Sequence, residues 1–233
     1  MTFGLVRRVI VASAAFAFVG LGYIWITLPD VRPLRKTPPA STAWMDMRAA
    51  QARAAGKPVR KNQRWVSYGR ISPNLTRAVL LAEDGAFWSH EGIDFDEMKM
   101  ALEDSWEKGE PLRGASTITQ QLAKNLYLSP SRNPTRKITE FLIARRLEAE
   151  LSKQRILELY LNEIEWGDGI WGCEAAARVY FGVSASDLSA EQAALMAGAI
   201  INPIRYSPAH PNGRLLRRQQ IILRRMGGVT VPY

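Results

Sequence analysis

The chain has 233 residues and a formal net charge of +9 at pH 7. This length provides for one domain with a full hydrophobic core behind a membrane segment, and a second catalytic domain is not expected. The single cysteine, Cys173, excludes an intramolecular disulfide. The charge favours anionic partners such as nucleic acid, phospholipid headgroups or pyrophosphate, and it does not choose among them.

The first predicted element is a membrane anchor over residues 9–28. This stretch, VIVASAAFAFVGLGYIWITL, contains no charged residue. About 20 helical residues at roughly 1.5 Å each span the roughly 30 Å hydrocarbon core of a bilayer. A cleaved signal peptide is the competing interpretation, but the apolar run is too long for one and no A-x-A site follows closely. We therefore predict an uncleaved anchor behind a cytoplasmic tail of residues 1–8.

The orientation of the anchor rests on weaker signals. Arg7 and Arg8 precede the span, whereas Arg32, Arg35 and Lys36 follow it, so the count of positive charges is nearly even. A short tail followed by a large domain is consistent with export of that domain.

After the anchor, the sequence predicts a mainly α-helical body without internal repeats or sustained strand alternation. Residues 29–62 are expected to form a proline-rich spacer and a short helix around residues 43–55, and residues 63–228 the globular domain. The segment RWVSY (64–68) could be a brief extended piece. Helix signals then follow at Ser72–Pro73, at a Thr117–Gln120 capping box, at Asn133–Pro134, and over residues 152–162, 173–180, 189–200 and 211–226.

Two adjacent carboxylates, Glu83 and Asp84, end the apolar run of the helix that starts after Ser72. At about 100° per residue, Glu83 falls at the edge of the apolar stripe, whereas Asp84 points to nearly the opposite side. A carboxylate at the margin of an apolar face is partly desolvated, which raises its pKa and makes it a better base. A helix-end glutamate paired with a nearby arginine is the alternative, and the local pattern alone favours it.

Glu140 lies on the apolar face of the long predicted helix, in line with Ala144 and Leu147, so we expect it to point into the body. A buried acid needs partners, and Arg136 lies one turn earlier with Lys137 close by. Both cations occupy the first helical turn, where the helix dipole disfavours them. An anion held by that helix N-terminus and the two cations would explain this placement. A structural Arg136–Glu140 ion pair explains it equally well.

The segment GASTITQQLAKN (114–125) concentrates hydroxyls, amides and a lysine at a helix start. Gln120 and Lys124 are four residues apart and can present hydrogen-bond donors together. The glycine and lysine spacing excludes a Walker loop, and the alternative is a well-capped helix without a ligand. His90 and His210 lack metal-ligand spacing, so we interpret both as structural.

With these positions in place, the chain resembles the peptidoglycan glycosyltransferase family, whose transglycosylase domain also occurs in bifunctional penicillin-binding proteins. EDGAFWSHEGID matches the E-D-x-x-F-x-x-H-x-G motif, GASTITQQLAKN the G-x-S-T-x-T-Q-Q motif and RKITE the R-K-x-x-E motif, and ILELYLN and GDGIWGCEAAARVYFG match two later motifs. Five motifs in order over about residues 70–208 make this resemblance highly specific. Val183 departs from it, since a lysine is frequent there in relatives. The end at Tyr233 without a transpeptidase domain is typical of the monofunctional, membrane-anchored form.

The resemblance implies a lysozyme-like helical glycosyltransferase domain that polymerises lipid II in the periplasm, anchored in the inner membrane by one transmembrane helix. Glu83 would be the general base that takes the proton from the acceptor 4-hydroxyl. Undecaprenyl pyrophosphate would leave, and the α-linked donor would become a β-1,4 bond by inversion. Glu140 would be the second catalytic carboxylate, positioning the cations or holding a divalent cation such as Mg²⁺ or Mn²⁺, and no covalent cofactor is implied.

The resemblance also assigns supporting residues and partners. Substrate and pyrophosphate binding would fall to Ser116, Thr117, Gln120, Gln121, Lys124, Arg136 and Lys137, and motif support to Asp84, Phe87, His90 and Gly92. The expected partners are lipid II, the growing lipid-linked glycan strand, the membrane and proteins of cell-wall synthesis or division, with no nucleic acid. A lipid-facing side would carry Met98, Met100, Leu102 and Trp106, for which core packing is the alternative.

Two other functions use similar residues. A lytic glycosidase would also place carboxylates on a lysozyme-like scaffold, but it needs an acid for the leaving oxygen and has no use for a pyrophosphate site. A membrane-anchored, non-enzymatic scaffold of the cell-wall machinery is a different class. The intact motifs around Glu83 and Glu140 argue against it.

Overall fold

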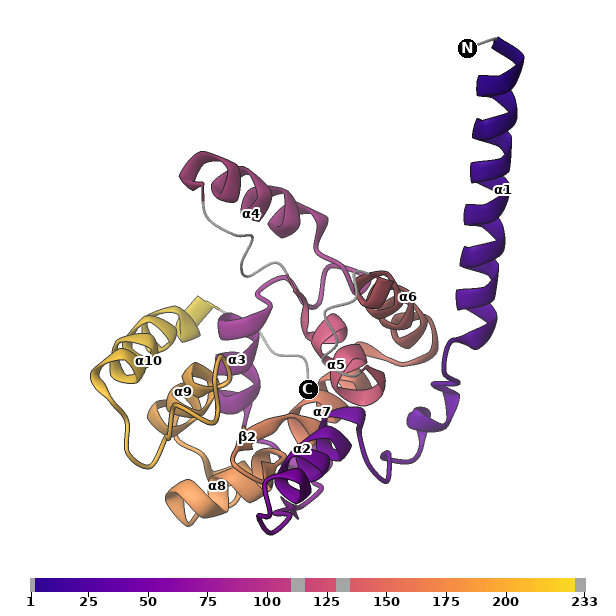
Figure 1. The fold of residues 1–233 in the computed structure, drawn as a ribbon. Coiled ribbons are helices and arrows are strands. Elements are labelled where there is room, and N and C mark those ends of the chain that lie inside the picture. The colour runs from indigo at the N-terminus through magenta and orange to yellow at the C-terminus, as the bar shows by residue number, and fades with distance from the viewer. Residues whose placement is uncertain (1–2, 110–115, 129–134, 229–233) are drawn as a thin grey trace.

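The computed structural model describes residues 3–109, 116–128 and 135–228, and it consists of a helical body from which a long N-terminal helix projects (Figure 1). This helix, α1 (Phe3–Thr27), contains Gly4–Ile24, which is the one stretch of the described chain long and apolar enough to cross a membrane. The finding is consistent with the predicted single-pass anchor. The helix begins before the predicted span, so Arg7 and Arg8 lie within α1.

The body is mainly α-helical, which confirms the predicted fold class. Its α-helices are α2 (Ala43–Ala54), α3 (Pro73–Glu83), α4 (Phe95–Lys108), α5 (Ile118–Tyr127), α6 (Thr135–Glu150), α7 (Lys153–Glu163), α8 (Cys173–Phe181), α9 (Ala190–Ala199) and α10 (Gly213–Arg225). Short 3-10 segments lie at η1 (Arg32–Arg35), η2 (Tyr68–Arg70), η3 (Ala185–Asp187) and η4 (Met226–Gly228). The predicted short helix before the domain is α2.

Two of the predicted helix starts are confirmed by their caps. The Ser72 hydroxyl accepts the backbone N–H of Asn74 at 3.3 Å at the start of α3. Thr117 and Gln120 form the expected capping box at the start of α5. The predicted start of the long helix at residues 133 and 134 lies outside the described residues, and α6 begins at Thr135.

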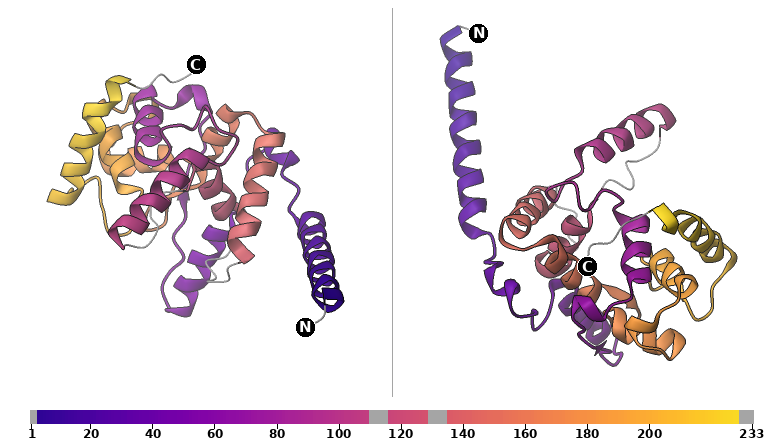
Figure 2. Two further views of the ribbon diagram at one scale, coloured as in Figure 1. Left: turned by 90° about the horizontal axis from the view of Figure 1, so that it is seen from above. Right: turned by 180° about the vertical axis from the view of Figure 1, so that it is seen from behind.

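Helix α4 was not predicted. Its N-cap is Asp94, whose carboxylate accepts the Glu97 backbone N–H at 2.8 Å, and its C-cap is Gly109, which adopts a left-handed conformation. None of its residues is buried. Figures 1 and 2 show α4 standing clear of the body on the side from which α1 also projects.

A small three-stranded sheet has the order β1-β3-β2, with β1 (Asn62–Gln63) parallel to β3 (Ile170–Trp171) and β2 (Glu165–Gly167) antiparallel to it. A brief extended piece was expected at residues 64–68, whereas the strand β1 lies just before these residues. The turn between β2 and β3 requires Gly169, because its φ is +71° and a Cβ there would lie 2.4 Å from the Cβ of Arg60.

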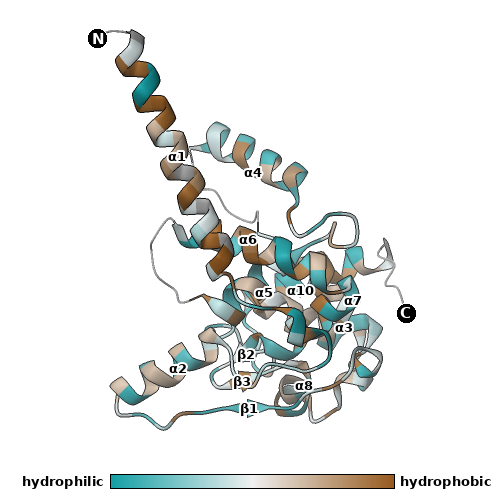
Figure 3. Ribbon diagram, turned by 90° about the vertical axis from the view of Figure 1, so that its right-hand side faces the viewer, coloured by the Kyte–Doolittle hydropathy of each residue, from teal (hydrophilic) through white to brown (hydrophobic). Residues whose placement is uncertain are grey.

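The core lies where α5 packs against α6 and α7, and where α3 packs against α9 and α10. Fully buried side chains include Leu75 of α3, Leu122 of α5, Leu147 of α6 and Tyr160 of α7. Outside this core, brown segments that mark hydrophobic residues follow much of α1 in Figure 3. The Ile118 backbone N–H donates to Asp84 Oδ2 at 2.9 Å, which joins the end of α3 to the start of α5 and so the first two motifs.

Candidate active site

Glu83, the last residue of α3, faces the first turns of α5. Its Oε2 accepts a hydrogen bond from Gln121 Nε2 at 2.8 Å, and the Tyr160 hydroxyl donates to Gln121 Oε1 at 2.9 Å. Burial raises the pKa of Glu83; the Gln121 hydrogen bond and the positive charges of Arg218 and Lys124 oppose this increase. The predicted partly desolvated carboxylate is therefore present in the structure.

Asp84 turns away from Glu83, as helical phase predicted. It is the C-cap of α3 and is buried, with Oδ1 2.9 Å from His90 Nε2 and Oδ2 accepting the Ile118 backbone N–H at 2.9 Å. Because the Gly92 N–H donates to His90 Nδ1 at 3.0 Å, the ring proton lies on Nε2 and is donated to Asp84. Asp84 thus joins the loop after α3 to the start of α5.

Phe87 and Gly92 support the same loop. Phe87 is fully buried and meets Trp88 edge-on, with ring centroids 5.0 Å apart. The Gly92 carbonyl accepts the Thr117 hydroxyl at 2.7 Å. Gly92 has φ of +86°, and a Cβ there would lie 2.9 Å from Cγ of Glu148, so this position requires glycine.

Glu140 of α6 is buried and holds two cations, as the sequence predicted. Its Oε2 lies 3.3 Å from Arg136 NH1, and its Oε1 accepts from Lys137 Nζ. Lys137 also donates to the exposed Ser116 hydroxyl at 3.3 Å, which links α6 to the residues just before α5. Arg136 and Lys137, the two cations predicted in the first turn of the helix, therefore form one charged group with the carboxylate of Glu140.

Lys124 of α5 is close enough to both carboxylates for each to act on its charge. Burial lowers its pKa, and nearby Arg136 and Lys137 lower it further, whereas Glu140 and Glu83 oppose the decrease. Since both acids act on the same ammonium group, the structure places the two halves of the predicted site in one electrostatic neighbourhood.

The structure also gives Lys124 an aromatic neighbour. Lys124 Nζ lies 6.0 Å from the ring centroid of Trp44, whose indole N–H donates to Glu165 Oε2 at 3.3 Å. Helix α2, which lies just before the predicted domain, therefore contributes to the surroundings of this cation.

Two of the predicted binding residues are engaged in helix capping. The Thr117 hydroxyl accepts the Gln120 backbone N–H at 3.2 Å, and Gln120 Oε1 accepts the Thr117 backbone N–H at 3.1 Å. Both residues are buried. Their contact with substrate stays a prediction, and the structure supports the capped-helix alternative for them. Gly114 and Ala115 of the same motif lie outside the described residues.

Sequence reasoning missed two members of this site. Tyr160 lies in the ILELYLN motif, which could have indicated it. Arg218 of α10 donates from Nε to the Gly198 carbonyl at 3.0 Å and is one of the charges that lower the pKa of Glu83. It lies outside all five motifs, and only the basic character of its segment could have drawn attention to it.

The surroundings of Glu140 do not fit a divalent cation. Both of its carboxylate oxygens already face positively charged side chains, whereas a hard cation needs several oxygen ligands. Across residues 3–109, 116–128 and 135–228, no group of three or more His, Cys, Asp or Glu side chains could hold a metal ion. His90 contacts Asp84, and His210 is exposed.

Comparison with known proteins identifies the family. The transglycosylase family model matches residues 50–227. A biosynthetic peptidoglycan transglycosylase of Laribacter hongkongensis is 51% identical over 195 residues, which is 83% of this chain and 85% of the relative. Proteins of the same name from Chromobacterium violaceum and Thiobacillus denitrificans are 43% identical over 224 residues and 45% over 221, covering 96% and 94% of this chain and 97% and 94% of the relatives.

The chain belongs to the transglycosylase family, a class of glycosyl-transferring enzymes with a lysozyme-like helical domain. Within this family it groups with the biosynthetic peptidoglycan transglycosylases. The predicted family and transferase class are thereby confirmed. The predicted roles of individual residues are not tested by these likenesses.

Proposed function

We propose that the chain polymerises lipid II into peptidoglycan strands by inverting β-1,4 glycosyl transfer, with release of undecaprenyl pyrophosphate. The observation that carries this proposal is the position of Glu83. It is a partly desolvated carboxylate within the same electrostatic neighbourhood as a cluster of cations, Lys124, Arg136 and Lys137. A base beside a cationic group suits an acceptor hydroxyl that attacks a donor carrying a pyrophosphate.

In the proposed reaction, Glu83 removes the proton from the acceptor 4-hydroxyl as its oxygen attacks the donor anomeric carbon. The bond from that carbon to the pyrophosphate oxygen breaks, and the negative charge that develops there is stabilised by Lys124, Arg136 and Lys137. Glu140 holds two of these cations in place through its buried carboxylate. A general base contributes about 10²- to 10⁴-fold in rate, so the cations must supply much of the remainder.

We propose that α1 anchors the enzyme in the inner membrane with the body in the periplasm. An anchored enzyme meets a lipid-linked substrate at a high effective concentration. On α4, which extends on the same side as α1, the exposed side chains include Met100, Leu102 and Trp106, the last 88% exposed. Together with Met98 they suit contact with the acyl chains near the lipid substrate.

The test is to incubate the full chain, in detergent or lipid, with lipid II and to separate the products on a gel. Glycan strands are expected. Soluble sugar fragments from preformed cell wall would favour the lytic glycosidase, and turnover of neither substrate would favour the non-enzymatic scaffold.

A variant then tests the role of the base. Glu83→Gln should reduce polymer formation by about 10²-fold or more because the amide cannot accept the proton. Its unfolding temperature should remain close to that of the parent protein, since Gln121 can still bond to the amide oxygen. Near-normal polymerisation by this variant would remove Glu83 from its proposed role.

A further inference from the structure

Helix α10 presents a row of arginines that the proposed reaction does not use. Arg214, Arg217, Arg224 and Arg225 are all exposed, and we call them the α10 basic face. Arg214, Arg217 and Arg224 are spaced by three and seven residues, so they share one side of the helix. The opposite side, with Leu215 and Ile222, is buried against the body.

Within the part of the chain that the structure describes, the α10 basic face has no carboxylate partner. Helix α10 contains no acidic residue, and among the described residues none of its arginines forms an ion pair. The polar contacts that the described residues make with the face are Arg214 NH1 with the Tyr206 hydroxyl at 3.5 Å and Arg224 Nε with the Gln220 carbonyl at 3.2 Å. By contrast, many other arginines of the body are paired, such as Arg48 with Glu165 and Arg178 with Glu174. Concentrated positive charge without internal compensation creates a field that attracts an anionic surface.

Apolar side chains are interleaved with these charges. Ile221 is 46% exposed and lies between Arg217 and Arg224 on the same side of the helix, and Leu216 is 43% exposed nearby. A helix that combines arginines with apolar residues and has a buried opposite face can rest on the headgroup region of a bilayer.

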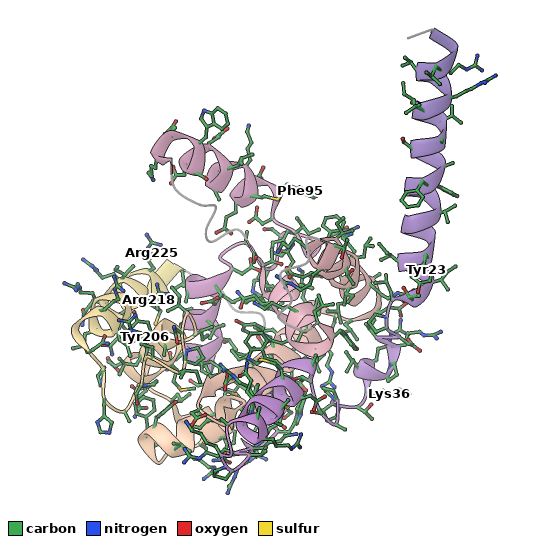
Figure 4. All side chains as sticks on the ribbon, viewed as in Figure 1. Tyr23, Lys36, Phe95, Tyr206, Arg218 and Arg225 are labelled. Carbon is green, nitrogen blue, oxygen red and sulfur yellow. The ribbon has the colours of Figure 1, made fainter. Side chains whose placement is uncertain are left out.

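The position of α10 indicates which anionic surface it meets. Figure 1 shows α10 at the edge of the body below α4 and across the body from α1, whereas α2 and the sheet lie farther from α4. In Figure 4, Arg225 lies beyond Arg218 along α10 in the direction of α4, and Tyr206 lies on the other side of Arg218. The Arg225 end of the basic face is therefore directed toward α4, which stands on the same side of the body as α1.

We propose that the α10 basic face docks on the anionic phospholipid headgroups of the membrane that holds α1. This inference rests on the membrane anchoring proposed above, but not on the reaction. Docking at α10, in addition to tethering by α1, would fix the tilt of the body over the bilayer. Because Arg218 of the same helix acts on Glu83, the docked helix would also hold one wall of the site at a constant height above the headgroups.

The experiment uses the full chain in lipid nanodiscs with one fluorescent label. Cys173 is fully buried, so a cysteine introduced on the surface is labelled selectively. Ile221→Cys carries the label on the basic face, and Gln51→Cys on exposed α2 is the control position. Quenching by acrylamide is measured in phosphatidylcholine discs with and without phosphatidylglycerol. Acrylamide is neutral, so the arginines do not attract it.

We expect the label at residue 221 to be protected from acrylamide in discs with phosphatidylglycerol, and to be accessible in phosphatidylcholine alone or at high salt. The label at residue 51 should be accessible in both lipids. An arginine near an anionic surface contributes about fivefold to binding, so the double change Arg217→Gln and Arg224→Gln should lower the ratio of docked to undocked protein about 25-fold. The exposed Arg53→Gln change on α2 should leave the ratio unchanged.

Two results would overturn the proposal. Equal protection of residue 221 in both lipids would show docking without charge recognition. Accessibility of residue 221 in every disc would leave the basic face in water, where an acidic protein surface would be the better occupant. In residues 3–109, 116–128 and 135–228 neither substituted arginine pairs with a carboxylate, so the variants should melt as the parent protein does. A chain that fails to enter the discs would instead contradict the anchoring proposed for α1.

Discussion

Glu163, at the end of α7, gives a quantitative prediction about stability. Only 1% of its surface is exposed. Gln63 Nε2 donates to its Oε2 at 3.2 Å, whereas Oε1 is a buried atom that has no hydrogen-bond partner among the described residues. Burial raises the pKa of Glu163 from 4.5 to about 7, against the hydrogen bond from Gln63 and the charges of Lys61 and Arg155. The folded protein therefore keeps a proton on this group at a pH where the unfolded chain has lost it.

The sign of the effect follows from proton linkage. Because the folded state binds the extra proton, this group destabilises the fold progressively as pH rises from about 4.5 to about 7. At about 1.4 kcal/mol per pH unit, the full effect is about 3 kcal/mol above pH 7. Replacing Glu163 with glutamine removes the ionisation and keeps an oxygen that can accept from Gln63. The cost of an unpartnered amide N–H reduces the expected gain to about 1–3 kcal/mol.

Thermal unfolding of the full chain in detergent micelles measures this gain, with the fluorescence of the buried Trp166 and Trp171 as the signal. At pH 8, Glu163→Gln should unfold roughly 3–10 °C above the parent protein, and near pH 5 the two should nearly coincide. The comparison between the two proteins at each pH cancels the other titrating groups. A difference that does not change between pH 5 and pH 8, or a variant less stable at pH 8, would refute the reasoning.

Three further predictions concern the site and are checked by the rate of polymer formation from lipid II. Glu140→Gln should lower kcat by about tenfold or more, because Lys137 loses its charged partner; unchanged rates would leave Glu140 with a structural role only. Tyr160→Phe should lower kcat/KM about fivefold, because Gln121 loses the hydroxyl that orients it, and an unchanged value would show that Gln121 is held by other contacts. In the parent enzyme, kcat/KM should rise with pH through the elevated pKa of Glu83. Gln121→Leu should move that rise to higher pH, because it removes a hydrogen bond that lowers the pKa of Glu83. A rise centred at or below the ordinary pKa of glutamate would contradict this.

Local signals in the sequence predicted most of the helices. The caps at Ser72 and Thr117 depend on residues two or three positions away, and the structure shows the hydrogen bonds that those signals indicate. Helix α4 escaped prediction because it buries none of its side chains, so it lacks the apolar stripe that marks a packed helix. The strands are only two or three residues long, which is too short for an alternating pattern.

The site was predicted where the chemistry lies within one helix or one motif. Glu140 and its cations are three and four residues apart, and the predicted contacts are present. Arg218 approaches Glu83 only because α10 packs on α3 and α9, and nothing in its local sequence specifies that approach. Trp44 likewise reaches Lys124 through the packing of α2 on α5.

Two adjacent residues at the end of α3, Glu83 and the C-cap Asp84, have different roles. Glu83 keeps helical geometry and faces the cations, whereas Asp84 leaves it, with φ of −167°, and ties the loop to α5. Because Asp84 bonds the backbone of α5 whereas Glu83 bonds the side chain of Gln121, position 83 should tolerate exchange better than position 84. A protein with an altered residue 83 would therefore keep an intact binding surface, which makes it a suitable starting point for trapping an unreacted substrate.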